Sequence, residues 1–286
     1  MRNYKIGVML DSFRLPFSQA VKKAAEIGAD ALQISAYSPV FSPAEMSASD
    51  RAAAFREIRD SGLSVSAICG DLGGHGFAVA ADNPRKIEIS KRILDIALEF
   101  DTKVVTTHIG VIPADRSGAY GVMQQACYEL AEYAAGNGGY FAVETGPETP
   151  VVLGQFLDSL NSNGVAVNYD PANLVMVTAS DPVAGVHTLK DKIVHTHAKD
   201  GIQLQKCDPA VIYNFFAEGG IEDLRLEDYF KELPLGCGNV NIPAWINALD
   251  EINYNGYLTI EREVGATPCE DIEAAVRYLK GIMAEK

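Results

Sequence analysis

Cysteine is scarce and dispersed in this chain of 286 residues. The five cysteines lie at least 30 residues apart and form no Cys-x-x-Cys pair, which excludes a zinc knuckle and the dense disulfide framework of a small secreted domain. Long hydrophobic runs are missing from the N-terminus as well, because only a five-residue apolar run precedes Asp11. Such a run is too short for a signal-peptide core or a membrane span. We therefore expect reduced thiols and a cytoplasmic protein.

Positive charge is also in short supply. The chain has 24 Lys and Arg against 38 Asp and Glu, a formal net charge of −14. Such a charge repels nucleic-acid phosphates and anionic membrane surfaces at long range, so neither is expected as a partner. Apolar residues make up 48% of the chain and charged residues 22%, which excludes disorder and is ordinary for a globular protein of enzyme size.

Eight short apolar segments rich in β-branched residues recur along the chain. They begin at Lys5, Ala31, Val65, Lys103, Tyr140, Gly164, Lys192 and Tyr257. Their nearly continuous apolar character indicates parallel strands that are buried on both faces, rather than half-exposed antiparallel strands.

Helical patterns separate these segments. They cover residues 18–28, 50–61, 84–100, 119–135, 150–162, 182–190, 242–253 and 269–283. Eight alternations of strand and helix predict an α/β fold in which residues 1–286 form a single (β/α)8 TIM barrel domain. Residues 201–240 form a long insertion between strands 7 and 8, with a possible helix at 209–217 and the glycine-rich PLGCGNV. Loops of this length are usually lids or inserted elements.

Polar side chains end four successive strands of the predicted barrel. The fifth ends in Glu144, the sixth in Asp170, the seventh in His197 and the eighth in Glu261. Active sites of such barrels lie at the carboxyl ends of the strands, so these four side chains are expected at one depth in the barrel mouth. The residues two positions earlier share this inward parity and are small or polar: Ala142, Asn168, His195 and Thr259.

Three carboxylates that converge in a barrel mouth repel one another unless they are protonated or share a cation. A single Asp or Glu at a strand end is an ordinary turn or helix-cap residue, but four polar ends in succession favour a metal site. Three oxygen donors and one nitrogen donor favour Mn²⁺, with Mg²⁺, Co²⁺ and Zn²⁺ as alternatives.

Further candidates surround these four positions. His108 ends the fourth strand and is a second metal ligand, a substrate contact or an interior histidine, of which we favour the substrate contact. His75 lies in the loop GDLGGHGF and either closes over substrate or is solvated. Lys199 either holds a substrate hydroxyl or phosphate or forms a salt bridge to Glu144 or Glu148. Glu148 is also a candidate for contact with the substrate at the rim.

The segments FAVETGPE, NYDPANL, VHTHAKD, PLGCGNVNI and YLTIERE resemble those of xylose isomerase-like TIM barrels, the sugar phosphate isomerase/epimerase superfamily that includes AP endonuclease family 2. The resemblance covers essentially the whole chain. It implies that Glu144, Asp170, His197 and Glu261 hold one divalent metal ion, and that the protein is a homo-oligomer, a dimer or a tetramer. Many relatives have His three residues after the Asp of strand 6; Asn173 stands here, so an amide replaces imidazole as the expected substrate contact.

The resemblance also implies a reaction. We expect a metal-dependent sugar isomerase or epimerase that acts on a ketose, a keto-sugar or an inosose. Glu144 and Glu261 would remove and return a proton through a metal-stabilised enediolate. Return to the same carbon gives an epimer, and return to the neighbouring carbon gives an isomer.

Three alternatives remain at this point. A lyase or dehydratase of the same family would act on a keto-inositol or a 3-keto-glycoside through the same type of intermediate. A phosphodiesterase like endonuclease IV is disfavoured, because its trinuclear cluster needs more histidines than the five present and because this chain is acidic. A non-catalytic sugar-binding barrel is disfavoured by the presence of both Glu144 and Glu261.

Overall fold

Eight parallel strands close into a barrel in the computed structural model, which describes residues 2–116, 118–221 and 223–284. The strands are β1 (Lys5–Met9), β2 (Ala31–Ser35), β3 (Ser64–Cys69), β4 (Val104–Thr107), β5 (Tyr140–Glu144), β6 (Val165–Tyr169), β7 (Ile193–Ala198) and β10 (Tyr257–Ile260). Each pairs with its sequence neighbours among these eight, and β1 closes the ring against β10. The predicted (β/α)8 barrel is therefore confirmed. Its strands are buried on both faces, by helices on the outside of the barrel and by side chains on the inside.

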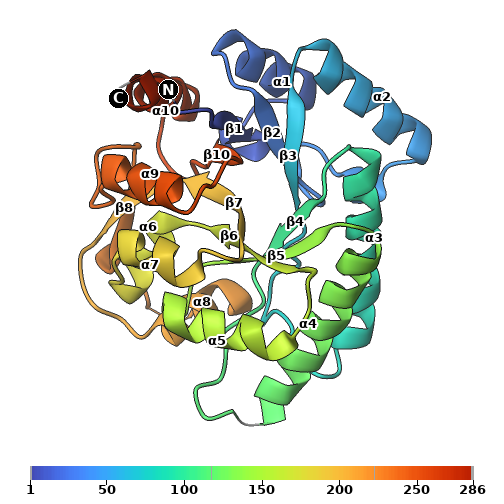
Figure 1. Ribbon diagram of the computed structural model, residues 1–286, viewed down its shortest axis with the longest axis vertical. Helices are drawn as coiled ribbons and strands as arrows, with labels where there is room; N and C mark the ends of the chain where they lie inside the picture. Colours follow the sequence, from blue (N-terminus) through green and yellow to red (C-terminus); the bar gives the residue numbers. More distant parts are fainter. Residues whose placement is uncertain (1, 117, 222, 285–286) are drawn as a thin grey trace.

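Helices surround the barrel, as Figure 1 shows. They are α1 (Phe17–Glu26), α2 (Ala48–Asp60), α3 (Asn83–Glu99), α4 (Gly118–Gly136), α5 (Pro150–Leu160), α7 (Pro182–Leu189), α9 (Ile242–Glu251) and α10 (Pro268–Ala284). Local sequence fixes several starts: at α5, Thr149 accepts a hydrogen bond from the Val152 N–H while Pro150 takes the first helical position. Short 3-10 turns lie at η1 (Leu10–Phe13), η2 (Pro43–Glu45) and η4 (Leu226–Asp228).

Three of the polar residues that were predicted to face the barrel interior are buried there. Asn168, His195 and Thr259 are fully buried and hydrogen-bond one another across three strands. Nδ1 of His195 lies 2.8 Å from Oδ1 of Asn168, and Nε2 of His195 lies 2.9 Å from the Thr259 hydroxyl. These bonds form a polar layer directly beneath the strand ends, and this layer supports the side chains above it.

Two irregular segments were not anticipated in detail. After β6 the chain forms one turn, α6 (Pro171–Asn173), and then a π-helix, η3 (Leu174–Thr178). After β7 it forms an antiparallel hairpin of β8 (Asp200–Gln203) and β9 (Phe230–Leu233), with α8 (Pro209–Glu218) between the two strands. In Figure 1, α8 is the orange helix near α5. The predicted helix at 209–217 agrees with α8, whereas the hairpin was missed.

One buried carboxylate anchors the hairpin to the glycine-rich segment that follows it. Asp200 accepts hydrogen bonds from the backbone N–H groups of Gly201, Gly236, Gly238 and Val240. A Cβ added at Gly238 would lie 2.2 Å from the Asp200 carboxylate, so glycine is required there. A second anchor is the ion pair between Arg262, two residues after the last barrel strand, and Glu232 of β9 at 2.5 Å.

The two ends of the described chain meet at α10, where Nη1 of Arg2 donates a hydrogen bond to the carbonyl of Ile282 at 2.9 Å (Figure 1). None of the helices among the described residues combines the length and the apolarity that a membrane-spanning segment requires.

Candidate metal centre

Glu144, Asp170, His197 and Glu261 meet at the carboxyl end of the barrel. Glu144 is the last residue of β5, Asp170 follows β6, His197 lies near the end of β7 and Glu261 follows β10. One oxygen or nitrogen atom from each side chain lies within 4.8 Å of the others. The first three side chains are buried and Glu261 is partly exposed. Because the parallel strands all end at the same end of the barrel, four residues that are up to 117 positions apart in the sequence lie close together.

Hydrogen bonds on the far side of the ring orient His197. Nε2 of His197 lies 2.9 Å from Oε1 of Gln33, whose own amide nitrogen donates to the Thr106 hydroxyl at 2.9 Å. Gln33 thus presents its amide oxygen to Nε2 of His197, and the amide nitrogen of Asn168 lies 3.3 Å from the same atom. Nδ1 is then left facing the carboxylates, at 3.3 Å from Glu261 and 3.5 Å from Glu144. A second partner that orients the ring in this way is typical of a histidine that ligates a metal.

Two buried atoms at this point lack a hydrogen bond. Nδ1 of His197 and Oδ2 of Asp170 have no hydrogen-bond partner within the described chain, although they lie 3.7 Å apart. The other oxygen of Asp170 accepts from the N–H groups of Ala172 at 2.7 Å and Asn173 at 3.1 Å. Buried polar atoms in proteins are normally paired, so both unpartnered atoms indicate a ligand between them. A divalent cation fits this donor set of three oxygens and one nitrogen.

The glutamates of the centre are held as carboxylates. Burial raises the pKa of Glu144, but the imidazoles of His197 and His108 more than offset this and lower that pKa below its usual value. Burial acts in the same direction on Glu261, and the charges of His197 and Lys199 bring its pKa well below the usual range. Both side chains are therefore available as anionic ligands for a cation.

Lys199 points into the same cluster. Its ammonium lies 2.8 Å from Oε2 of Glu261, 3.9 Å from Oδ2 of Asp170, and also donates to Glu263. Burial lowers the pKa of Lys199, but Glu261 and Glu263 together raise it well above the usual value. The salt bridge foreseen as one alternative is present, but its partners are Glu261 and Glu263 and not Glu144 or Glu148.

His108 stands at the edge of the centre between two carboxylates. Nδ1 lies 3.1 Å from Oδ2 of Asp71 and Nε2 lies 3.7 Å from Oε1 of Glu144. Burial lowers the pKa of His108, yet these carboxylates raise it to about 10, so the ring is a cation at neutral pH. Asp71 was missed in the sequence, although an aspartate two residues after a strand end, in CGDLGG, was a visible signal.

A cavity of about 490 Å³ opens above the centre. Six of the predicted site residues line it: His75, His108, Glu144, Asn173, Lys199 and Glu261. Asp170 and His197 lie beneath its surface. Asn173 donates both amide hydrogens, to Oε1 of Glu144 at 3.2 Å and to the carbonyl of Thr145 at 3.1 Å, which leaves its own oxygen available to a ligand. His75 reaches across the mouth to Glu218 of α8 at 2.7 Å.

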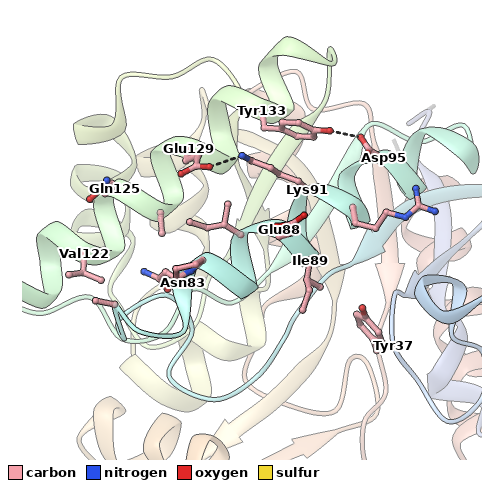
Figure 2. Close-up of a pocket in the computed structure, with 15 residues that line it drawn as sticks. Tyr37, Asn83, Glu88, Ile89, Lys91, Asp95, Val122, Gln125, Glu129 and Tyr133 are labelled. Atoms are coloured by element: carbon pink, nitrogen blue, oxygen red, sulfur yellow. Dashed lines mark hydrogen bonds and ion pairs between the residues drawn. The ribbon is translucent and has the colours of Figure 1, made fainter.

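A larger hollow of about 1030 Å³ lies on the outer face of the barrel, between α3 and α4 (Figure 2). Four of its polar side chains form two pairs: Lys91 contacts Glu129 at 2.6 Å, and the Tyr133 hydroxyl donates to Asp95 at 2.9 Å. These four side chains are satisfied without a ligand, although Oδ1 of Asn83 in the same lining has no hydrogen-bond partner in the described chain. The barrel mouth instead brings unpartnered atoms of two potential metal ligands, Asp170 and His197, within 3.7 Å of each other. The smaller cavity is therefore the candidate site.

Glu148 stands apart from the cavity lining. Its Oε1 accepts a hydrogen bond of 2.6 Å from the backbone N–H of Ile112, so the side chain fixes the loop after β4. Burial raises the pKa of Glu148 from 4.5 to about 7. Its predicted contact with a substrate stays a prediction, because the side chain meets the protein backbone here.

Replacing Glu148 by Gln is expected to remove a pH-dependent loss of stability. The folded pKa lies above the unfolded one, so the stabilisation by the protonated acid is complete below about pH 4.5 and is lost as pH rises through about 7. At about 1.4 kcal/mol per pH unit, the variant should gain about 3 kcal/mol over the wild type between pH 4 and pH 8. Urea unfolding at both pH values measures this gain; parallel changes in the two proteins would contradict it.

A model of the family described as xylose isomerase-like TIM barrel matches residues 21–282. An uncharacterized protein from Methanocaldococcus jannaschii is 24% identical over 214 residues, which is 70% of this chain and 64% of that protein. The chain thus spans less than two thirds of the length of this relative.

Solved structures share the fold. A xylose isomerase domain protein from Planctomyces limnophilus has a TM-score of 0.78 at 22% identity, covering 98% of this chain and 97% of that one. A D-psicose 3-epimerase solved in the presence of D-fructose has a TM-score of 0.73 at 16% identity, covering 98% and 100%. A probable 3-DHS dehydratase involved in petrobactin synthesis from Bacillus anthracis has 0.69 at 18%, covering 96% and 98%. At these identities the likeness concerns the fold alone.

Proposed function

The chain belongs to the xylose isomerase-like TIM barrel family, and from that premise we propose that it is a metal-dependent enzyme that transfers a proton next to the carbonyl group of a sugar or polyol. An isomerase or epimerase acting on a ketose, a keto-sugar or an inosose is the form we favour. The observation that carries the proposal is the pair of unpartnered buried atoms, on Asp170 and His197, at the floor of a cavity that two ionised glutamates line.

Glu144, Asp170, His197 and Glu261 would hold the divalent ion, for which we propose Mn²⁺ because oxygen donors predominate. When bound there, such an ion polarises a substrate carbonyl and makes the neighbouring C–H more acidic. His197 is suited to the role of ligand because Gln33 keeps its Nδ1 directed at the carboxylates.

The two glutamates that line the cavity would move the proton. Glu144 extends from β5 and Glu261 follows β10, and β6 and β7 separate these strands in the barrel. The two carboxylates therefore approach a substrate from different sides. One glutamate removes a proton from carbon and later loses it to solvent. The other, which is ionised at rest, first takes a proton from solvent or, for Glu261, from the adjacent Lys199 ammonium, and then delivers it to carbon. Lys199 and Asn173 offer a cation and an amide oxygen to the substrate hydroxyls at the same depth.

A dehydratase or lyase of the same family is the second candidate, and His108 is the observation that favours it. The Asp71 and Glu144 carboxylates keep this imidazole protonated at neutral pH, and it lines the cavity. A cationic imidazole beside a substrate can donate a proton to a departing hydroxyl or glycosidic oxygen.

Proton exchange with solvent tests both candidates. The Mn²⁺-loaded protein is incubated in D₂O with ketoses, 3-keto-sugars and inososes, and the substrates are followed by NMR. We expect deuterium at the carbon next to the carbonyl of at least one compound, with retention of all atoms in an isomerase or epimerase and loss of water or aglycone in a lyase. Absence of exchange from all three classes would overturn the proposal.

A further inference from the structure

One wall of the cavity is apolar, in contrast to its charged floor. Helix α8 contributes the apolar and aromatic side chains of Ile212, Tyr213, Phe216 and Ala217 to the lining, together with one polar residue, Asn214. Phe230 of β9 and Met176 and Val177 of η3 extend the same wall. A sugar presents hydroxyl groups on most of its surface, so a wall of this kind offers it few hydrogen bonds. We call Tyr213 and Phe216 together the aromatic wall.

Tyr213 connects this wall to the chemistry. Its ring lies 5.7 Å from the ring of His108, centroid to centroid. A Cβ added at Gly146 would lie 2.1 Å from the Tyr213 hydroxyl oxygen, so the glycine after β5 makes room for this side chain. The hydroxyl makes no hydrogen bond with the described part of the chain. It is therefore a polar group without a partner in the described chain, on a side chain that lines the same cavity as Glu144.

Phe216 is the most unusual residue of the wall. Its side chain is 60% exposed although it lines a cavity, and its ring contacts that of Tyr213 at 6.4 Å with an interplanar angle of 72°. An aromatic side chain left this open to water is stabilised when a planar apolar group covers it. Because Phe216 is so exposed, a planar apolar group that covers it would lie near the cavity mouth, away from the charged floor formed by Glu144 and Glu261.

The size of the cavity agrees with a substrate that has two parts. A hexose displaces about six liquid waters, or roughly 180 Å³. The cavity of about 490 Å³ holds more than twice that volume. With a hexose on the charged floor, the space that remains is bounded by the aromatic wall.

We propose that the substrate is a keto-sugar that carries a planar, apolar substituent, and that this substituent packs against Tyr213 and Phe216. The inference rests on the proposed function, whose substrate class it narrows. The sugar part occupies the floor near Glu144 and Glu261. The substituent lies under α8, where Phe216 contacts its face and the Tyr213 hydroxyl bonds the oxygen that joins the two parts.

The first experiment measures binding, which is independent of turnover. Calorimetry compares 4-nitrophenyl β-D-glucopyranoside with D-glucose on the Mn²⁺-loaded protein, since neither compound has a carbonyl next to an acidic C–H in its ring form. We expect the aryl glycoside to bind at least tenfold more tightly. Phe216→Ala should reduce this ratio about tenfold, the effect of one lost aromatic contact. Phe215→Ala is the matched control, because Phe215 is the adjacent ring on α8 and does not line the cavity; the ratio should change less than twofold.

The second experiment measures turnover of 4-nitrophenyl 3-keto-β-D-glucopyranoside and of 3-keto-D-glucose. We expect kcat/KM to favour the aryl compound at least tenfold in the wild type, and Phe216→Ala to reduce this preference about tenfold. Circular dichroism of each variant reports whether α8 remains folded.

The outcomes separate the two proposals. Aryl-selective binding that depends on Phe216, without proton exchange or turnover of any keto-sugar, would support the aromatic wall and overturn the proposed function. Turnover of both compounds with equal kcat/KM, together with equal binding of aryl glycoside and glucose, would support the function and overturn the wall. Equal losses in Phe216→Ala and Phe215→Ala would also overturn it, because a displaced helix would then explain the effect.

Discussion

Replacing Glu144 by Gln is expected to lower kcat by a factor of about 10²–10⁴, the usual contribution of a positioned general base. The amide cannot accept a proton from carbon, yet its carbonyl oxygen can still act as a donor to a cation. Asn168 donates to Oε2 of Glu144 at 2.9 Å and Asn173 donates to Oε1 at 3.2 Å, so the glutamine keeps one of these two hydrogen bonds, the one that its oxygen faces. The measurement is kcat on a substrate found by proton exchange, at saturating Mn²⁺.

A control variant distinguishes lost chemistry from lost charge. Glu129→Gln makes the same change on α4, where Glu129 pairs with Lys91 in the outer hollow, and kcat should stay within twofold of the wild type. Elemental analysis of both variants should show that metal is retained. Unchanged turnover in Glu144→Gln would remove this residue from the proton transfer, and turnover lost only in step with lost metal would reassign it to ligation alone.

Removing the divalent ion is expected to abolish turnover, with a loss of about 10³-fold, and to lower the thermal unfolding midpoint. The loss follows because polarisation of a carbonyl by a metal is worth several kcal/mol of barrier. The stability effect follows because an ion that binds only the folded chain adds about 2.7 kcal/mol at a concentration 100 times its Kd. Without the ion, the carboxylates of Glu144, Asp170 and Glu261 repel one another in a buried space.

The variant Asp170→Ala makes this test specific to the site. It removes the unpartnered Oδ2 and should lower bound metal from about one ion per chain to less than a tenth, because the remaining three ligands lose a buried anion. Asp95→Asn, which alters a carboxylate of the outer hollow, should bind as much metal as the wild type. Full metal content in Asp170→Ala, or a midpoint that does not respond to Mn²⁺ after chelation, would contradict the metal centre.

The barrel and the four ends of its strands could be predicted because both follow from one pattern. Strands that are buried on both faces are almost continuously apolar, so a single Glu, Asp or His at the end of such a strand is conspicuous. Glu144 after FAV and Asp170 after VAVNY are examples. The register of parallel strands then requires the ends to lie at one depth, and the structure brings them together.

Other features depend on packing that a sequence pattern does not carry. Gln33 appears as one amide in the apolar segment ALQIS, but its role depends on the partner across the barrel, His197, which is 164 positions away. Lys199 was seen as a cation at the right depth, whereas its partner Glu263 lies beyond the last strand, on a segment whose course the pattern leaves open. The direction of Tyr213 and Phe216 depends on how the hairpin of β8 and β9 seats α8 against the mouth.

Asp200 fastens the hairpin to the glycine-rich segment that follows it, and the pair of Arg262 with Glu232 fastens it to the end of the barrel, while α8 belongs to the stretch between β8 and β9. The residues that would react with a substrate and those that would recognise its outer part are consequently carried by separate stretches of chain. Exchanging residues 204–229 for those of another protein could retarget the barrel to a new molecule, while its catalytic floor is inherited intact.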